Sequence, residues 1–147
     1  MPALRFLFLI LFLPGIAVAE SDLVTKQSVH DVKATVDKLE AIVKEKGMTV
    51  FARIDHRANA ESVDIDMPDS QVLIFGAPTA GTRIMLHDLA AGLDLPLRVL
   101  AYTGSDGNTW VVYHNPQGLK QNFRVSESKV LPKVEAVLDT MTDQIIK

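Results

Sequence analysis

The sequence predicts an α+β fold in which helices pack on a small, mostly antiparallel β-sheet. Apolar residues recur at alternating spacings of three and four within residues 29–45 and 128–146, which is the period of a half-buried helix. Short runs of branched and aromatic residues lie between these segments, and a loop at residues 104–108 has the glycine and asparagine content of a hairpin. Helical and strand segments do not alternate strictly, so a doubly wound parallel sheet is not expected.

The first part of the chain after residue 19 predicts a leader, a helix and a strand. Residues 20–35 are expected to form a polar leader that runs into the start of the helix, and Gly47 to end that helix. Residues 50–54 alternate as a strand does, and residues 58–62 have the composition of a single helical turn. The apolar stripe of the helix comprises Val29, Val32, Val36, Leu39 and Val43.

The middle of the chain predicts a central strand followed by a helix. Residues 71–75 are almost continuously apolar, which is typical of a strand that is buried on both faces. A helix is expected to follow, running to about Leu89 with Thr79 as its cap. Gly92 is expected to end that helix.

The last part of the chain predicts a hairpin and a closing helix. Residues 97–102 and 109–113 read as the two strands of the hairpin, and Asn115-Pro116 starts a short turn or helix. The closing helix is expected over residues 128–146. Its predicted apolar stripe comprises Val130, Val134, Val137, Met141 and Ile145.

Residues 1–19 have the layout of a cleavable secretory signal peptide. Arg5 precedes an apolar run over residues 6–13, and small residues occupy the positions that signal peptidase reads before a cut after Ala19. The apolar run is shorter than the roughly 20 residues that a spanning helix needs. We therefore expect a periplasmic or secreted domain that leaves the membrane after cleavage, with an uncleaved anchor as the alternative.

Composition excludes several classes of function. The chain has no cysteine, so disulfides, thiolate metal sites, iron–sulfur clusters and cysteine nucleophiles are all excluded. Removal of residues 1–19 removes Arg5 and no acidic residue, so the net charge changes from −3 to −4. An acidic domain without a basic stripe is not expected to bind nucleic acid. The remaining length suits one domain.

A set of short motifs follows in a fixed order between residues 51 and 116. Each motif is weak alone, and the order and spacing of the set make it specific. The set comprises FARIDH at residues 51–56, LIFGAP at 73–78, LDLPLRVL at 93–100, Gly107 in the hairpin loop, VVY at 111–113, and Pro116.

The ordered set resembles the DUF302 domain, a bacterial and archaeal family of unknown function, over about residues 36–145. The resemblance implies a compact α+β fold of the TT1751-like type, often found as a homodimer, and it implies no established reaction. Some relatives carry cysteines near the glycine-proline turn and after the later leucine-proline. Residues 75–78 and 95–97 occupy those places here and contain none, so a thiol-based role does not carry over.

Asp55 and His56 form the first candidate site. Adjacent residues on a strand point to opposite faces, so these side chains converge only if the chain turns, as residues 57–59 suggest. One interpretation makes His56 a general base or ligand that the carboxylate orients. The other makes Asp55 the cap of the following turn, with His56 bonded locally or at a dimer contact.

The histidines offer only weak candidates for a metal site. His30, His56, His87 and His114 are isolated in the sequence, and none has the close spacing that places two imidazoles on one helix face. His56 and His114 both lie at predicted strand ends and are the two that we expect to meet, if any do. We expect no cofactor and no bound metal.

The turn after the central strand is the second candidate site. Gly76, Pro78 and Thr79 lead into a helix, and the free N–H groups at a helix start attract anions. We predict one ligand site formed by this turn together with Asp55 and His56, in a non-enzymatic homodimer that binds a small ligand or a protein. The alternatives are an enzyme with an Asp55-His56 general base and a metal-binding periplasmic protein.

Overall fold

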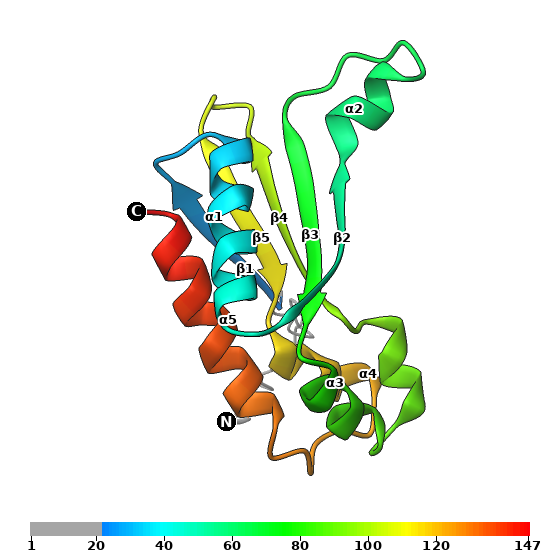
Figure 1. Cartoon of the computed structure of the whole chain (residues 1–147). Coiled ribbons are helices and arrows are strands. Elements are labelled where there is room, and N and C mark those ends of the chain that lie inside the picture. Colours follow the sequence, from blue (N-terminus) through cyan, green and yellow to red (C-terminus); the bar gives the residue numbers. More distant parts are fainter. Residues whose placement is uncertain (1–21) are drawn as a thin grey trace, which may run out of the picture.

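The computed structural model describes residues 22–147 and confirms an α+β fold (Figure 1). A five-stranded antiparallel sheet has the strand order β1-β5-β4-β3-β2, and α1 and α5 pack side by side on one of its faces. The predicted signal peptide, residues 1–19, lies outside the described residues. The strands are β1 (Leu23–Ser28), β2 (Thr49–Asp55), β3 (Ser70–Gly76), β4 (Leu97–Thr103) and β5 (Thr109–His114).

The helices differ in length and in role. Two long ones cover the sheet, and the shorter ones cap its two ends (Figure 1). Within residues 22–147, no helix has the length and apolar character needed to cross a membrane. The helices are α1 (Val32–Glu45), α2 (His56–Glu61), α3 (Pro78–Met85), α4 (Leu119–Asn122) and α5 (Leu131–Ile145), with 3-10 helices η1 (Leu89–Leu93) and η2 (Pro116–Gly118).

The main core lies between the sheet and the two long helices. Asp31 starts α1 by accepting a hydrogen bond from the Ala34 N–H at 2.7 Å, which satisfies one of the orphan donors of the first turn. Four residues of the predicted α1 stripe are buried, and Val29 is not, because it precedes the helix and is 77% exposed. The core comprises Val32, Val36, Leu39 and Val43 of α1, Leu138, Met141 and Ile145 of α5, and Leu73, Phe75, Val99, Ala101, Val111 and Tyr113 of the sheet.

The polar leader contains a strand that the sequence did not predict. β1 pairs with β5 along its whole length, from Leu23 opposite His114 to Ser28 opposite Thr109. Its outward residues are exposed, and the inward Lys26 is covered because Asp139 and Asp143 of α5 hold its ammonium at 2.7 Å each. Polar residues on both faces hide the period of two that marks a strand.

The apolar stripe of α5 is rotated from the predicted one. Val137 is 39% exposed, whereas Leu138 and Thr142 are buried. Thr142 enters the core because its hydroxyl donates to the Leu138 carbonyl at 2.9 Å, so its polar atom is satisfied. Both stripes obey helical spacing, so the spacing alone did not select the correct one.

The central strand β3 is buried on one face and not on both. Leu73 and Phe75 point toward α1 and α5 and are fully buried, whereas Val72 and Ile74 on the other side are half-buried. Because α1 and α5 both lie on one face of the sheet, the other face of the sheet remains accessible (Figure 1). The apolar residues of β3 on this accessible face are the reason that the sequence predicted a strand buried on both faces.

The helix after β3 is shorter than predicted. Ala77 takes the N-cap position of α3, with Pro78 as its first residue, and within residues 22–147 no side chain caps it. Thr79 is therefore not the cap. The chain leaves α3 at Met85 and continues as the separate helix η1, which contains Gly92 instead of ending at it.

The sheet splits at one end, and this split positions the site described below. Pairing between β4 and β5 runs only from Leu100 opposite Val112 to Thr103 opposite Thr109. Pairing of β1 with β5 continues on to His114, and pairing of β3 with β4 continues on to Leu97. Beyond Leu100 and Val112, the sheet therefore divides into a β1–β5 half and a β2–β3–β4 half.

Candidate functional site

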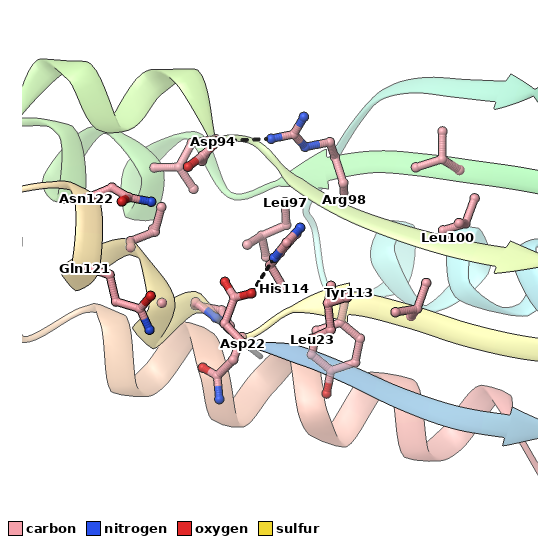
Figure 2. A pocket seen from close by; sticks show the side chains of 17 residues that line it. Asp22, Leu23, Asp94, Leu97, Arg98, Leu100, Tyr113, His114, Gln121 and Asn122 are labelled. Carbon is pink, nitrogen blue, oxygen red and sulfur yellow. Dashed lines mark hydrogen bonds and ion pairs between the residues drawn. The ribbon is translucent and has the colours of Figure 1, made fainter. Parts of the chain in front are cut away.

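A pocket of about 780 Å³ opens where the two halves of the sheet separate (Figure 2). Strands of both halves supply its lining, and η2 and α4 close its end. We call it the split pocket. Its apolar lining residues on the strands and the loop before β4 are Leu23, Val72, Leu95, Leu97, Leu100 and Val112.

Asp22 and His114 form one wall of the split pocket, called the β5 lip. The His114 Nδ1–H donates to Asp22 Oδ1 at 2.8 Å, because the β1–β5 register places Leu23 directly opposite His114. The backbone fixes Asp22 further, since the Asn115 N–H donates to the Asp22 carbonyl at 2.7 Å. Gly118 leaves room for this arrangement: a Cβ at Gly118 would lie 2.5 Å from Asp22 Oδ2.

Asp94 and Arg98 form the facing wall, called the β4 lip. Arg98 Nη2 lies 3.5 Å from Asp94 Oδ1, and the Arg98 side chain is 51% exposed. Figure 2 shows the two pairs on opposite sides of the pocket with Leu97 between them. Each lip therefore combines one carboxylate with one nitrogen base.

The end wall of the split pocket is attached to α5. Asn115 and Gln117 both donate side-chain N–H groups to Glu135, at 2.8 and 2.9 Å. These two hydrogen bonds, that of Asn115 first, lower the pKa of Glu135 below its ordinary value. They fix the turn from which α4 presents the amides of Gln121 and Asn122 to the pocket (Figure 2).

The chemistry available in the split pocket is polar recognition above an apolar floor. A carboxylate that orients an imidazole is also the arrangement of a general base, and here it leaves Nε2 of His114 on the opposite side of the ring from Asp22. The His114 side chain is 72% exposed. Among residues 22–147, no three His, Asp or Glu side chains gather in a geometry that would hold a metal ion.

The structure places Asp55 at a helix cap. Its Oδ1 accepts from the Ala58 N–H at 2.9 Å and its Oδ2 accepts from Gln71 Nε2 at 2.9 Å. Both oxygens are therefore engaged by α2 and β3, and His56 is the first residue of α2. This is the capping interpretation of the Asp55-His56 pair.

The structure does not bring His56 and His114 together. β2 ends beside His56 and β5 ends at His114. Antiparallel pairing through β3 and β4 makes β5 run opposite to β2, so these two strand ends lie at opposite ends of the sheet. A metal site shared by the two histidines is incompatible with this topology.

The two candidate turns are also separate. Asp55 pairs with Gln71 at one end of the β2–β3 ladder, and Gly76 pairs with Thr49 at the other end, so one site cannot contain both turns. Gly76 and Pro78 instead line an apolar pocket of about 220 Å³. Thr79 is not part of the lining of that pocket.

Sequence reasoning missed Asp22, Asp94 and Arg98 as site residues and named His114 only as a weak metal candidate. Asp22 lies 92 residues before His114, so their contact depends on the pairing of β1 with β5. The spacing of residues along the sequence cannot predict a contact between residues so far apart. Asp94 and Arg98 both lie within the LDLPLRVL motif at residues 93–100, and that motif was the signal available for them.

Comparison with known proteins places the chain in a family. The family model described as "Domain of unknown function DUF302" matches residues 24–145. The crystal structure of an uncharacterized conserved DUF302 protein from Bacillus stearothermophilus superposes with a TM-score of 0.66 at 18% sequence identity, covering 84% of this chain and 94% of that one. At this identity the likeness shows the fold alone, which agrees with the expected TT1751-like type.

The curated relatives are longer proteins. The chain is 38% identical over 115 residues to the fluoride-specific ion channel FluC 1 of Brucella suis biovar 1 (strain 1330), which covers 78% of this chain and 45% of that protein. The chain is also 38% identical over 115 residues to the fluoride-specific ion channel FluC 1 of Brucella abortus biovar 1 (strain 9-941). That match covers 78% of this chain and 43% of that protein. The chain thus spans less than half the length of the curated relatives that it matches.

Proposed function

The chain belongs to the DUF302 family, and on that premise we propose that it is an exported, non-enzymatic domain that binds a small amphipathic ligand in the split pocket. The observation that carries the proposal is the pocket itself, about 780 Å³ in volume between two polar lips. Pockets for small ligands commonly have volumes of about 300–1,000 Å³, a mostly apolar lining and a few placed polar groups. The split pocket has all three properties.

The organisation of the chain supports export. The first strand begins at Leu23, so the cut expected after Ala19 leaves every described element of the fold intact. The mature chain would retain Asp22 and with it the β5 lip. We therefore propose that the working form comprises residues 20–147 and acts in the periplasm or outside the cell.

An exposed apolar surface supports a homodimer as part of this proposal. Leu86, Leu89 and Leu93 lie within one short segment and are 75%, 80% and 80% exposed. We call these three residues the leucine patch. Large apolar side chains concentrated and exposed in one short segment are candidates for a contact with another molecule. A second copy of the chain is the occupant that we propose.

The test of the ligand proposal is native mass spectrometry of residues 20–147, purified from periplasm without a metal-affinity tag. We expect a retained small molecule in the wild type and its loss in Leu100→Trp, which adds bulk to the pocket floor. Val63→Trp is the control, because Val63 is 62% exposed and lies outside the pocket lining. A wild type without any bound species, or equal retention by Leu100→Trp, would contradict the proposal.

A second candidate function follows from the Brucella relatives. Proteins named fluoride-specific ion channels contain a segment 38% identical to this chain, and the rest of each protein is unmatched. We propose that the matched segment is an accessory domain in those proteins and that this chain serves a membrane channel in the same way. A strain that lacks the chain should then show altered sensitivity to fluoride, restored by the wild-type chain. Unaltered sensitivity would leave ligand binding as the remaining candidate.

A further inference from the structure

We infer that the split pocket selects a ligand with a carboxylate head and an apolar body, and that Arg98 binds the carboxylate. This inference rests on the proposed function, because it names the class of ligand for the same pocket. Its basis is the contrast between the two lips: Asp22 of the β5 lip has a short hydrogen bond to His114, whereas Arg98 of the β4 lip has one long contact to Asp94.

The β5 lip already has short polar contacts of its own. Asp22 accepts from His114 at 2.8 Å, its carbonyl accepts from the Asn115 N–H at 2.7 Å, and its carboxylate lies against Gly118. A carboxylate with a short charge-assisted or polar partner has little need of a cationic ligand group. The β5 lip is therefore a poor recognition element for an amine.

The β4 lip contains a guanidinium with few hydrogen-bond partners. Within residues 22–147, the polar partner of Arg98 is Asp94 alone, reached by Nη2 at 3.5 Å, which is longer than an ordinary N–H···O hydrogen bond. A guanidinium has five N–H donors in a planar fork that matches a carboxylate in a bidentate manner. Most of the donors of Arg98 thus remain available to a ligand at the pocket mouth.

Asp94 competes with a ligand carboxylate only weakly. Its side chain is 42% exposed and makes a single long contact to Arg98, and exposed pairs of this kind contribute little free energy. A bidentate carboxylate gains two parallel hydrogen bonds and replaces one marginal contact. The amides of Gln121 and Asn122, which line the same pocket, add further N–H donors.

The floor between the lips fits an apolar body. Leu97 lies between the two charged pairs (Figure 2), and Leu100 of β4 and Val112 of β5 line the same pocket from the two halves of the sheet. Each square ångström of apolar surface removed from water contributes about 25 cal/mol. An alkyl or aryl acid would thus place its head on Arg98 and its body along the split.

The experiment is isothermal titration calorimetry of residues 20–147 with octanoate, 1-octanol and octylamine as probes. We expect octanoate to bind most tightly, and Arg98→Met to weaken octanoate by about tenfold or more while leaving 1-octanol unchanged. Arg98→Lys should fall between, because it keeps the charge and loses the planar fork. Arg124→Met is the control, since the Arg124 side chain is 90% exposed and lies outside the pocket lining.

Two kinds of failure can be told apart. Equal binding of octanoate and 1-octanol, preference for octylamine, or an Arg98→Met variant with wild-type affinity would overturn the carboxylate inference and leave the proposed function standing. A co-purified ligand without an acidic group would do the same. Absence of binding by all three probes, together with no species retained in the mass spectrum, would overturn both. A ¹H–¹⁵N spectrum of each variant verifies that it is folded.

Discussion

His114 Nδ1 lies 2.8 Å from Asp22 Oδ1, although 92 positions separate the two residues in the sequence. The contact joins the start of β1 to the end of β5 and defines one wall of the split pocket. An acceptor at Nδ1 selects the ring tautomer that carries its proton there.

The first prediction concerns this tautomer. At a pH where the ring is neutral, wild-type His114 should be mainly protonated on Nδ1, and Asp22→Ala should shift the proton to Nε2. Long-range ¹H–¹⁵N correlation spectra distinguish the two nitrogens directly. Identical tautomer ratios in wild type and Asp22→Ala would show that the contact does not persist in solution.

The second prediction concerns Gly118. An alanine Cβ there would meet Asp22 Oδ2 at 2.5 Å, and the flexible end of the aspartate would move to relieve the contact. Gly118→Ala should therefore reproduce the tautomer shift of Asp22→Ala while the chain remains folded. Gly81→Ala is the matched control, because apart from its chain neighbours and its own helix backbone no described atom lies within 4 Å of the Cβ it would add. A wild-type tautomer ratio in Gly118→Ala would be the contrary result.

The third prediction concerns Lys26, which ties β1 to α5. Its side chain is 13% exposed and reaches Asp139 and Asp143 at 2.7 Å each. Lys26→Met should lower the free energy of unfolding by about 1–2 kcal/mol, since charged hydrogen bonds of a mostly covered group are lost. Lys33→Met removes an exposed helical pair with Asp37 and should cost only about 0.5 kcal/mol or less. Urea denaturation of both variants measures the difference.

The pH dependence of this stabilisation follows from the pKa shifts of Lys26 and Asp139. Burial opposes the charge of Lys26, but hydrogen bonds to Asp139 and Asp143 outweigh it and raise its pKa. The hydrogen bond from Lys26 lowers the pKa of Asp139. The stabilisation is therefore complete between about pH 4 and pH 10, and it is lost as pH falls through the lowered pKa of Asp139 or rises through the raised pKa of Lys26. The gap between wild type and Lys26→Met should shrink below about pH 4.

The fourth prediction separates Asp55 from ligand binding. Asp55→Ala removes the cap of α2 and should destabilise that helix by about 1 kcal/mol, whereas Asp55→Asn should retain most of the cap. Because α2 buries no residue, the loss should appear as faster local hydrogen exchange in residues 56–61 more than as global unfolding. His56→Ala should leave octanoate affinity unchanged. A weakened octanoate affinity in His56→Ala would instead place the ligand site near His56, at the end of the sheet opposite the split pocket.

The fifth prediction concerns the leucine patch. Leu89→Asp combined with Leu93→Asp places charges on a surface proposed to contact a second copy, and should convert a dimer to a monomer. Sedimentation velocity measures the mass of each form. Val63→Asp is the control, because Val63 is an exposed apolar residue on a different segment, at 62%. A dimer that survives the double substitution would place the contact elsewhere.

The sequence predicted those elements whose own residues carry the relevant pattern. The α1 stripe and the hairpin at residues 104–108 are examples, because helical spacing and turn residues are local properties. Elements that depend on a distant partner were missed. β1 reads as polar because Lys26 is covered only when α5, more than a hundred residues later, supplies its carboxylates.

The candidate site shows the same division between local and distant information. Asp55 and His56 were a predicted site because they are adjacent in the sequence, and in the structure Asp55 is the N-cap of α2. The pair that lines a pocket is Asp22 with His114, which only strand pairing brings together. The pocket itself depends on where the β4–β5 ladder stops, at Leu100 and Val112, and no residue pattern marks that point.

The position of the last residues suits the protein to surface immobilisation. The Val29 N–H donates to the Ile146 carbonyl at 3.1 Å, and His30 Nε2 lies 2.6 Å from the Lys147 carbonyl oxygen, so Lys147 is held where β1 finishes. The split pocket lies where β1 starts, about 17 Å away at a rise of about 3.3 Å per residue. A sensor chip or bead coupled through Lys147 would leave the pocket facing the sample, and this geometry suits the domain to a capture assay with the proposed ligand.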